Sequence, residues 1–465
     1  MSRSRRAPDD PGQATPGQGV PLWRLLQEAS HALGQVRAGR SLTPVLEKTP
    51  PPLRAGAQAL SFHAMRWLGS AQCARDLLLQ RVAPGPLDDV LCVALTLLLP
   101  DEKLYDEFTV VNQAVEAVKR NARTRFGAGF LNACLRRCLK ERQTMAAAIQ
   151  GDDLARWNFP RWWIERLRAD HPQGWAGFLQ GAQRPAPLIL RVNARRRDAA
   201  DYLAQLARQG IEARRWGPTA VEIVHPLPIE RIPGFLAGDV SVQSATAQRA
   251  AALLADGLVG QARVLDACAA PGGKTAHLLE LRPDLRVLAL DMDAARSRRI
   301  GENLQRLDLR AEVQVADAAQ PGHWWDGRHF DAILLDAPCS GSGIVRRHPD
   351  IRWLRRASDI DALAARQDRL LRALWPLLRP GGRMLFCTCS VFRAEGDARL
   401  EAFLQCHNDA SDLASPGHLL PASGGNSARI GDNQTCDDDG FYYALLEKRP
   451  ARAVAVAARL RSRLG

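Results

Sequence analysis

The C-terminal half of the chain alternates apolar runs with helical patterns, and four successive runs end in aspartate. The runs RVLD, RVLALD, AEVQVAD and FDAILLD end at Asp266, Asp291, Asp317 and Asp336. Helical periodicity follows the first two runs, over Lys274–Leu281 and Ala294–Leu307. This alternation predicts a parallel, doubly wound α/β sheet over residues 246–448. Because the carboxyl ends of parallel strands share one edge, the four carboxylates predict a ligand site there.

The alternation continues towards the C-terminus. A helix is expected over Ile360–Leu378, followed by strands at RMLFCTCS and FYYALLEK. The polar segment from Ala410 to Asp439 shows no period, so we expect an irregular loop there. The last residues, 449–465, are rich in basic side chains and predict a flexible tail.

Residues 20–150 carry helical patterns throughout, and residues 1–19 are expected to be a disordered tail. The apolar run Val90–Leu99 is too short to span a bilayer and predicts a buried helix. A second helix is expected over Phe126–Leu139. Its predicted buried face comprises Phe130, Leu131, Cys134, Leu135, Cys138 and Leu139, with the cysteines as core side chains.

Residues 151–245 predict a small α/β segment. A short helix around Trp162 precedes strands at Pro187–Asn193 and Ala220–Val224, with a helix over Asp198–Gln209 between them. A polar stretch, GDVSVQSATAQ, leads into the next domain. The segment also holds a basic cluster formed by Arg191, Arg195, Arg196 and Arg197.

Composition excludes several classes of protein. The 465 residues are 46% hydrophobic and 24% charged, which is ordinary for a globular chain and unlike a fibrous or disordered one. The formal net charge of +13 indicates a polyanionic partner, most simply nucleic acid. Ten cysteines without CxxC pairs, signal peptide or membrane span predict no disulfide scaffold and no metal site. The expected location is the reducing cytoplasm.

The segment after Asp266 predicts the cofactor. Cys-Ala-Ala-Pro-Gly-Gly-Lys, residues 268–274, places a glycine pair between a strand and a helix, where backbone can approach a ligand closely. Asp291 follows about twenty residues later, the spacing of a carboxylate that meets a ribose diol. A phosphate-binding loop of the GxxxxGK[ST] type is disfavoured because Cys268 replaces its first glycine. The aspartates suit a cationic, phosphate-free ligand such as S-adenosylmethionine.

Three cysteines lie at the ends of two neighbouring strands. Cys339 is in the loop of LLDAPCSGSG, and Cys387 and Cys389 end LFCTCS. We expect a turn to begin there and to free Cys389 towards the pocket. A thiolate that adds to C6 of a pyrimidine makes C5 nucleophilic towards a methyl donor. Cys389, Cys339 and Asp336 could supply the nucleophile, the proton acceptor and a contact to the base; buried structural thiols or a regulatory disulfide are the alternative.

A basic segment follows Cys339. In GIVRRHPDIRWLRR, five arginines surround Trp353: Arg346, Arg347, Arg352, Arg355 and Arg356. Basic side chains interleaved with an aromatic suit a phosphate backbone and a stacked base. A solvated amphipathic helix is the alternative.

The motifs DACAAPGGKT, LLDAPCSGSGIVRRHPDIRW, LFCTCS and DGFYYALLEK, in this order, closely resemble the RNA cytosine-C5 methyltransferases. The resemblance is to the bacterial Sun/Fmu (RsmB-like) group, which modifies small-subunit ribosomal RNA, and it spans nearly the whole chain. It implies a NusB-like, RNA-binding helical domain at 20–150, an RRM-like segment at 151–245 and a Rossmann-like class I methyltransferase domain at 246–448.

The resemblance also implies the reaction and the site. The implied activity is S-adenosylmethionine-dependent methylation of C5 of one cytosine in 16S ribosomal RNA, by family the position 967 site, in a monomeric protein. Cys389 is the implied nucleophile, and Cys339 assists product release. The implied cofactor-binding residues are Cys268, Ala269, Ala270, Pro271, Gly272, Gly273, Lys274, Asp291, Asp317 and Asp336. One departure is Gln243-Ser244, where the family pattern has Gln-Asp.

Three other functions are compatible with the sequence. The substrate could be a transfer RNA or another RNA cytosine. The chain could be a non-catalytic RNA-binding assembly factor that uses its helical domain and basic segments. It could also be a nucleotide-dependent enzyme that uses GGKT. Binding of S-adenosylmethionine without binding of ATP separates the leading hypothesis from the last.

Overall fold

The computed structural model describes residues 19–421 and 438–450, so the two predicted tails lie almost wholly outside the described residues. The chain divides into two compact units, Met1–Asn158 and Phe159–Gly465. The division falls after Asn158 rather than at the predicted boundary of 150, because α8 and α9 pack on α4 of the first unit. The predicted α/β segment and the predicted methyltransferase domain share the second unit.

In the described part of the first unit, the regular elements are helices. They are α1 (Leu22–Arg37), α2 (Leu42–Glu47), α3 (Pro51–Arg66), α4 (Leu68–Leu78), α5 (Gly85–Leu98), α6 (Glu107–Lys119), η1 (Arg125–Gly127), α7 (Ala128–Lys140), α8 (Arg142–Gly151) and α9 (Asp153–Trp157). α5 is buried from Leu87 to Leu98 and contacts α1, α4, α6 and α7. The predicted buried helix is therefore confirmed as the core of this unit.

The predicted face of α7 is only partly right. Leu131, Cys134, Leu135 and Cys138 are buried as expected. Phe130, however, is 40% exposed, and Phe126 lies in η1 before the helix begins. The predicted buried face is too wide, because α7 packs against α6 and α5 on one side only and Phe130 falls outside that contact.

The second unit begins with α10 (Arg161–Asp170), α11 (Trp175–Gly181) and a small four-stranded antiparallel sheet of order β2-β3-β1-β4. Its elements are β1 (Leu188–Val192), α12 (Ala199–Arg208), β2 (Ala213–Arg215), β3 (Ala220–Ile223), η2 (Ile229–Arg231) and β4 (Val240–Val242). The two predicted strands and the helix between them are confirmed. The sequence missed β2 and β4, which are three residues each.

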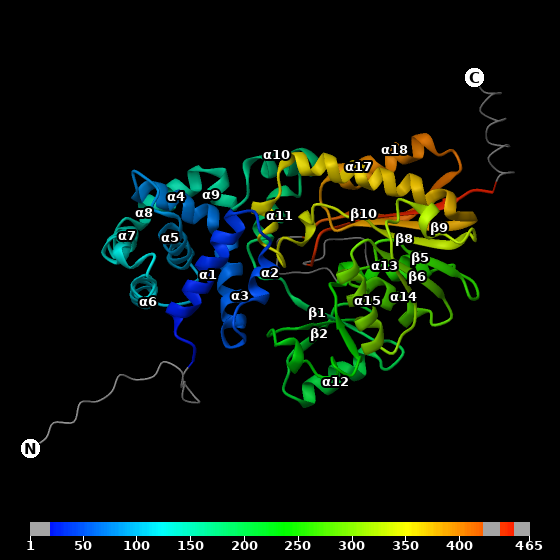
Figure 1. Ribbon diagram of the computed structural model, residues 1–465, viewed down its shortest axis with the longest axis horizontal. Helices are drawn as coiled ribbons and strands as arrows, with labels where there is room; N and C mark the ends of the chain where they lie inside the picture. The colour runs from blue at the N-terminus through cyan, green and yellow to red at the C-terminus, as the bar shows by residue number, and fades with distance from the viewer. Residues whose placement is uncertain (1–18, 422–437, 451–465) are drawn as a thin grey trace, which may run out of the picture. The chain divides into compact units, whose positions relative to one another are not determined.

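A seven-stranded sheet of order β10-β11-β9-β8-β5-β6-β7 follows. Its elements are α13 (Ala245–Ala255), β5 (Arg263–Asp266), α14 (Gly273–Leu281), β6 (Arg286–Asp291), α15 (Ala294–Arg306), β7 (Glu312–Val315), η3 (Pro321–His323), β8 (Phe330–Asp336), η4 (Ser342–Ile344), α16 (Ile351–Leu354), α17 (Ala357–Leu374), η5 (Trp375–Leu377), β9 (Leu378–Thr388), η6 (Arg393–Glu395), α18 (Asp397–Cys406), β10 (Ala410–Leu419) and β11 (Phe441–Lys448). Helices α13, α14 and α15 cover one face, and α17 and α18 cover the other (Figure 1).

Three expectations for this sheet are corrected. It is not fully parallel, because β11 runs antiparallel to β9 and β10 runs antiparallel to β11. The segment expected to be an irregular loop contains β10, whose pattern is hidden by a register shift between Leu413 and Gly417. The helix expected to reach Leu378 ends at Leu374 and is followed by the short turn η5, since Pro376 has no backbone N–H to donate to the carbonyl four residues earlier.

Candidate active site

The aspartates lie along one edge of the sheet, as expected. Asp336, Asp266 and Asp291 are the last residues of β8, β5 and β6, which are neighbours in the sheet. Asp317 lies two residues after β7 ends, so the third run was predicted slightly too long. The parallel topology therefore gathers carboxylates that are up to seventy residues apart at one edge.

The loop from Cys268 to Lys274 connects β5 to α14 at this edge. Gly272 has φ +94°, a conformation that L side chains rarely adopt, and a Cβ there would lie 3.2 Å from the Cα of Ile300. Two side chains of α15 hold the loop. Arg296 donates to the carbonyl of Ala270, and Asn303 donates to the carbonyl of Pro271 at 2.8 Å. No motif in the sequence signalled these two residues.

Asp266 braces the loop from inside the fold. It is fully buried, and its Oδ2 accepts a hydrogen bond from the Thr275 hydroxyl at 2.6 Å. Burial raises the pKa of Asp266 to about 7, although the bond from Thr275 opposes the shift. The carboxylate that ends the first strand is therefore structural.

Asp291 and Asp317 are held at the next two strand ends. Asp291 is 4% exposed, accepts from the backbone N–H of Asp293 at 3.0 Å and lies 3.4 Å from the Arg296 guanidinium. Burial acts to raise the pKa of Asp317, but hydrogen bonds from the Ala319 backbone and the Gln320 amide lower it overall. Carboxylate oxygens in these positions can accept hydrogen bonds from hydroxyl or amine groups of a ligand.

These residues fit S-adenosylmethionine. Its sulfonium is cationic and its ribose diol and adenine amine are hydrogen-bond donors, which match a row of carboxylates rather than a phosphate site. The close backbone turn at Gly272 and Gly273 meets the N-terminus of α14, so the chain can approach the ligand without an intervening side chain. Cys268, in the same loop, is partly buried.

The two cysteines of the predicted pair meet although fifty residues separate them. Cys339 Sγ and Cys389 Sγ are 3.3 Å apart, and both side chains are partly buried. β9 ends at Thr388, so Cys389 lies beyond the strand as expected. Cys387 is different. It is fully buried, and its thiol contacts Asp336 Oδ1 at 3.6 Å.

Lys274 joins the cofactor loop to the end of β8. Its ammonium lies 2.6 Å from Asp336 Oδ2. Burial alone would lower the pKa of Lys274, but the charges of Asp336, Cys387 and Cys389 raise it. The hydrogen bond to Cys389 raises the pKa of Cys339 well above its usual value, followed by burial and by the charges of Cys389 and Glu395. Cys339 is thus disposed to keep its proton.

Four of the five arginines after Cys339 are buried or half-buried, which is not expected of a phosphate-binding segment or of a solvated helix. Arg352 is fully buried and donates to the carbonyl of Ala182, and Arg346 is 4% exposed and donates to that of Pro185.

Arg347 pairs with Asp438 at 2.8 Å and Asp439 at 2.6 Å. Burial raises the pKa of Asp439 to about 6. Arg346 and Arg352 thus bond backbone carbonyls and Arg347 bonds carboxylates within the fold, and of the five arginines Arg356 is exposed.

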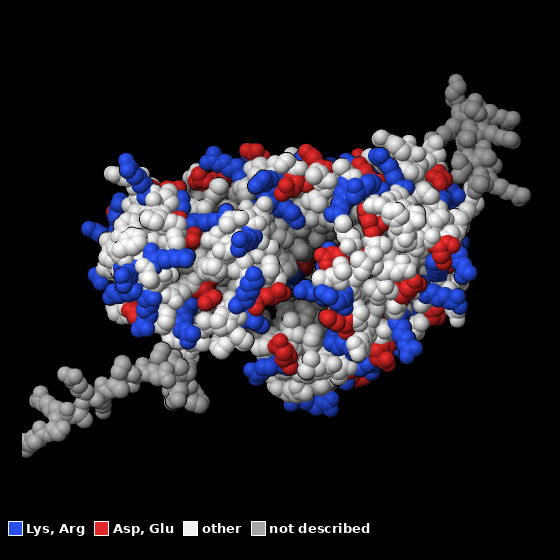
Figure 2. Space-filling view, in the orientation of Figure 1, with Lys and Arg blue, Asp and Glu red and all other residues white. Residues whose placement is uncertain are grey.

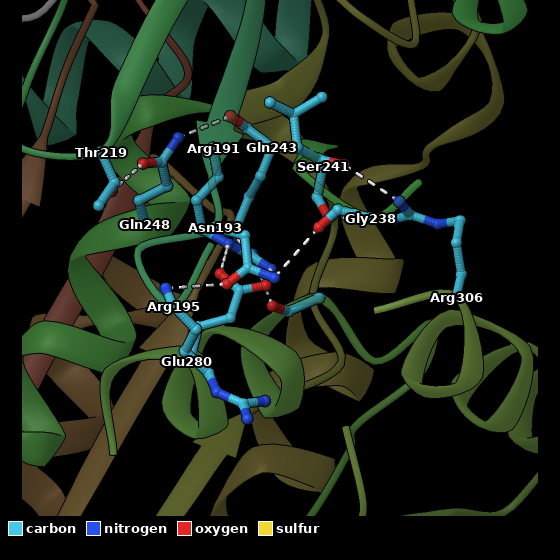
Figure 3. Close-up of polar contacts among 12 residues, drawn as sticks. Arg191, Asn193, Arg195, Thr219, Gly238, Ser241, Gln243, Gln248, Glu280 and Arg306 are labelled. Carbon is cyan, nitrogen blue, oxygen red and sulfur yellow. Dashed lines mark hydrogen bonds and ion pairs between the residues drawn. The ribbon is translucent and has the colours of Figure 1, made fainter. Parts of the chain in front are cut away.

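The other basic cluster is also partly structural (Figure 3). Arg191 is 1% exposed and pairs with Glu280 of α14 at 2.7 Å, which joins the small sheet to the large one. Arg195 and Arg196 remain exposed. Ser244, the departure from the family pattern, caps α13 at the Ala247 N–H and hydrogen-bonds Asp439.

Basic side chains elsewhere are spread over the visible face, with acidic ones between them (Figure 2). Within the described ranges, no helix is both long and apolar enough to cross a membrane.

Comparison with known proteins identifies the family. A model described as 16S rRNA methyltransferase RsmB/F matches residues 255–447, and an RsmF/B-like ferredoxin-like domain matches residues 159–230. Ribosomal RNA small subunit methyltransferase B of Xanthomonas campestris is 47% identical over 73% of this chain and 76% of its own length. The protein of the same name from Pseudomonas syringae is 37% identical over 91% of this chain and 97% of its own. The chain belongs to the RsmB/F methyltransferase family.

Solved structures share the fold of this chain. The crystal structure of PH0851 has a TM-score of 0.72 at 25% identity and covers 92% of this chain and 98% of its own. NSun6 from Pyrococcus horikoshii, solved with SFG, has a TM-score of 0.52 at 18% identity over 63% of this chain and 99% of its own, which shows the fold alone. The Rossmann-like methyltransferase fold is thereby confirmed, whereas the likeness of the helical unit to NusB stays a prediction.

Proposed function

We propose that this RsmB/F protein transfers a methyl group from S-adenosylmethionine to C5 of one specific cytosine in 16S ribosomal RNA. The observation that carries the proposal is the pair of thiols, 3.3 Å apart, beside a row of carboxylates that suits the methyl donor. The names of the relatives support small-subunit ribosomal RNA as the substrate. The thiols support cytosine as the target base, because methylation at C5 of a pyrimidine needs a nucleophile that adds to C6.

Each residue of the site has its own role in the proposed reaction. When bound, S-adenosylmethionine supplies an electrophilic methyl group. Asp291 and Asp317 bind its donor groups. Asp336, oriented by Lys274, keeps lone pairs that can accept from the exocyclic amine of cytosine. Cys387 is buried against Asp336 and takes no direct part.

Cys389 is the nucleophile in this mechanism. Its thiolate adds to C6 of the cytosine, and the electron pair of the C5–C6 double bond becomes available at C5, which attacks the methyl group. A water molecule takes the C5 proton, the electron pair of the C5–H bond re-forms the C5–C6 double bond, and the Cys389 sulfur leaves as a thiolate. Cys339, which keeps its proton at the start, is placed within hydrogen-bonding distance of the departing sulfur and stabilises it.

Replacing Cys339 with alanine is expected to trap the reaction after methyl transfer. Without the Cys339 thiol the sulfur of Cys389 leaves slowly, so a covalent protein–RNA species should accumulate and migrate above the free protein on a denaturing gel. Cys406→Ala, an exposed thiol outside the site, is the control and should show no adduct. An adduct with Cys389→Ala but not with Cys339→Ala would reverse the two roles.

Replacing Asp291 with asparagine is expected to weaken S-adenosylmethionine binding by about 10- to 100-fold, since a hydrogen bond to a charged group contributes roughly 1.5–3 kcal/mol. Isothermal titration calorimetry measures the affinity. Glu302→Gln, an exposed carboxylate on α15, is the matched control and should bind as the wild type. Equal affinity of the two variants would remove Asp291 from the cofactor site.

Bisulfite sequencing of ribosomal RNA tests the whole proposal. Cells that lack the gene should lose one protected cytosine in the small-subunit RNA, and the wild-type gene should restore it. Unchanged protection at every 16S cytosine would overturn the proposed substrate. The same sequencing applied to transfer RNA would then show whether another RNA is methylated, and no change there would favour a binding role.

A further inference from the structure

A buried carboxylate lies between the two cysteine loops. Glu395 is fully buried in η6, six residues after Cys389. Its Oε1 accepts from the Ser340 backbone N–H at 2.8 Å, and its Oε2 accepts from the Ser390 hydroxyl at 2.7 Å and from the Ser340 hydroxyl. Ser340 follows Cys339 in the chain and Ser390 follows Cys389, so one carboxyl group holds the residue next to each cysteine.

Further bonds make this arrangement rigid. Gln367 of α17 donates to Glu395 Oε1 at 3.4 Å and to the carbonyl of Pro338 at 2.9 Å. Cys339 is therefore held on both sides, through Pro338 and through Ser340. The donors to Glu395 among the described residues are uncharged, so hydrogen bonds compensate for its burial. A carboxylate buried without a cationic partner is costly, which points to a purpose beyond packing.

We propose that Glu395 is a positioning residue that clamps the Cys339 and Cys389 loops together and sets the relation between their sulfur atoms. The inference rests on the proposed function for its chemical meaning, since the clamp matters for catalysis only if both thiols act. Glu395 touches neither sulfur in the described hydrogen bonds, and it works through Ser340 and Ser390. Its negative charge also helps to keep Cys339 protonated.

The geometric part of the proposal is tested without RNA. Diamide converts two adjacent thiols into a disulfide; the thiols lose two hydrogen atoms, which reduce the reagent. In the wild type, the Cys339–Cys389 pair should cross-link quickly, and peptide mass spectrometry identifies the bond. Glu395→Gln removes the charge and one acceptor oxygen, and we expect cross-linking to slow by about tenfold or more. Glu401→Gln, an exposed carboxylate on α18, is the matched control.

The electrostatic part is tested by the pH dependence of Cys339 alkylation with iodoacetamide, followed by mass spectrometry. Removing the Glu395 charge lowers the pKa of Cys339, so the alkylation profile of Glu395→Gln should move to lower pH. Glu395→Asp keeps the charge but shortens the reach. The pH profile of Cys339 alkylation in Glu395→Asp should stay close to that of the wild type, while its cross-linking should remain slow. A general loosening of the fold would change both.

Methylation assays complete the test. Glu395→Gln should lower kcat by about 30-fold or more and leave the KM for S-adenosylmethionine unchanged. Wild-type cross-linking and wild-type kcat in a folded Glu395→Gln protein would overturn the proposal. If that variant does not fold, Ser390→Ala, which removes one donor to the carboxylate, decides by the same criteria. Should Cys389→Ala methylate normally, the proposed function fails, yet the cross-linking assay still decides whether Glu395 holds the two loops.

Discussion

Replacing Cys389 with alanine is expected to lower methyl transfer to 16S ribosomal RNA by at least about 10³-fold, a loss typical of removing a catalytic nucleophile. Without its thiolate, C5 of cytosine is not activated towards the methyl donor. Binding of S-adenosylmethionine should be nearly unchanged, because the carboxylate edge is intact. Transfer of a radiolabelled methyl group to RNA measures the first quantity, and calorimetry the second.

Cys387→Ala is the sharpest control for this prediction. Cys387 lies only two residues earlier, but it is buried in β9 and faces Asp336. Removing its side chain should lower the free energy of unfolding but leave the rate of methyl transfer within about tenfold of the wild type. Comparable losses in the two variants would contradict the assignment of Cys389 as nucleophile, and so would full activity of Cys389→Ala.

Replacing Arg191 with alanine is expected to destabilise the second unit by about 3–5 kcal/mol, because it leaves the buried carboxylate of Glu280 without its cation. Arg191 also donates to the carbonyl of Gly273, so the start of α14 loses a contact next to the cofactor loop. Urea unfolding, followed by a probe in this unit, measures the change in free energy.

The matched control is Arg195→Ala, which removes an exposed member of the same basic cluster and should cost less than about 0.5 kcal/mol. The double variant Arg191→Met with Glu280→Met removes both charges at similar volume and should recover most of the loss. A cost for Arg191→Ala as small as that for Arg195→Ala would show that the buried pair does not hold the small sheet to the large one.

Several features followed from local sequence alone. The alternation of apolar runs and helical patterns specified β5, β6 and β8, because each strand's residues encode their own period and end at an aspartate. The LFCTCS motif likewise predicted that a turn follows the strand now seen as β9. The second unit's C-terminal strands were harder. β11 was expected, but its antiparallel direction was not, since a strand's own residues do not encode its direction relative to its neighbour.

Three arginines of the segment after Cys339 show most clearly what the local sequence leaves undetermined. Arg346, Arg347 and Arg352 look like an RNA-binding segment in the sequence, yet in the fold they bond carbonyls and carboxylates from distant parts of the chain. A pattern of charges along the chain gives no information on which partners folding will bring to them. The positive net charge therefore indicated a polyanionic partner but did not identify the residues that contact it.

The sequence by itself determined β5, β6 and β8, the glycine turn before α14 and the candidate reactive side chains. These depend on local backbone preferences and on residue type. Only the tertiary structure decided that Cys339 and Cys389 meet, that Cys387 is buried, and that Glu395 lies between the two loops. Those relations arise from packing between segments distant in sequence, where hydrogen bonds and burial depend on neighbours that no local pattern names.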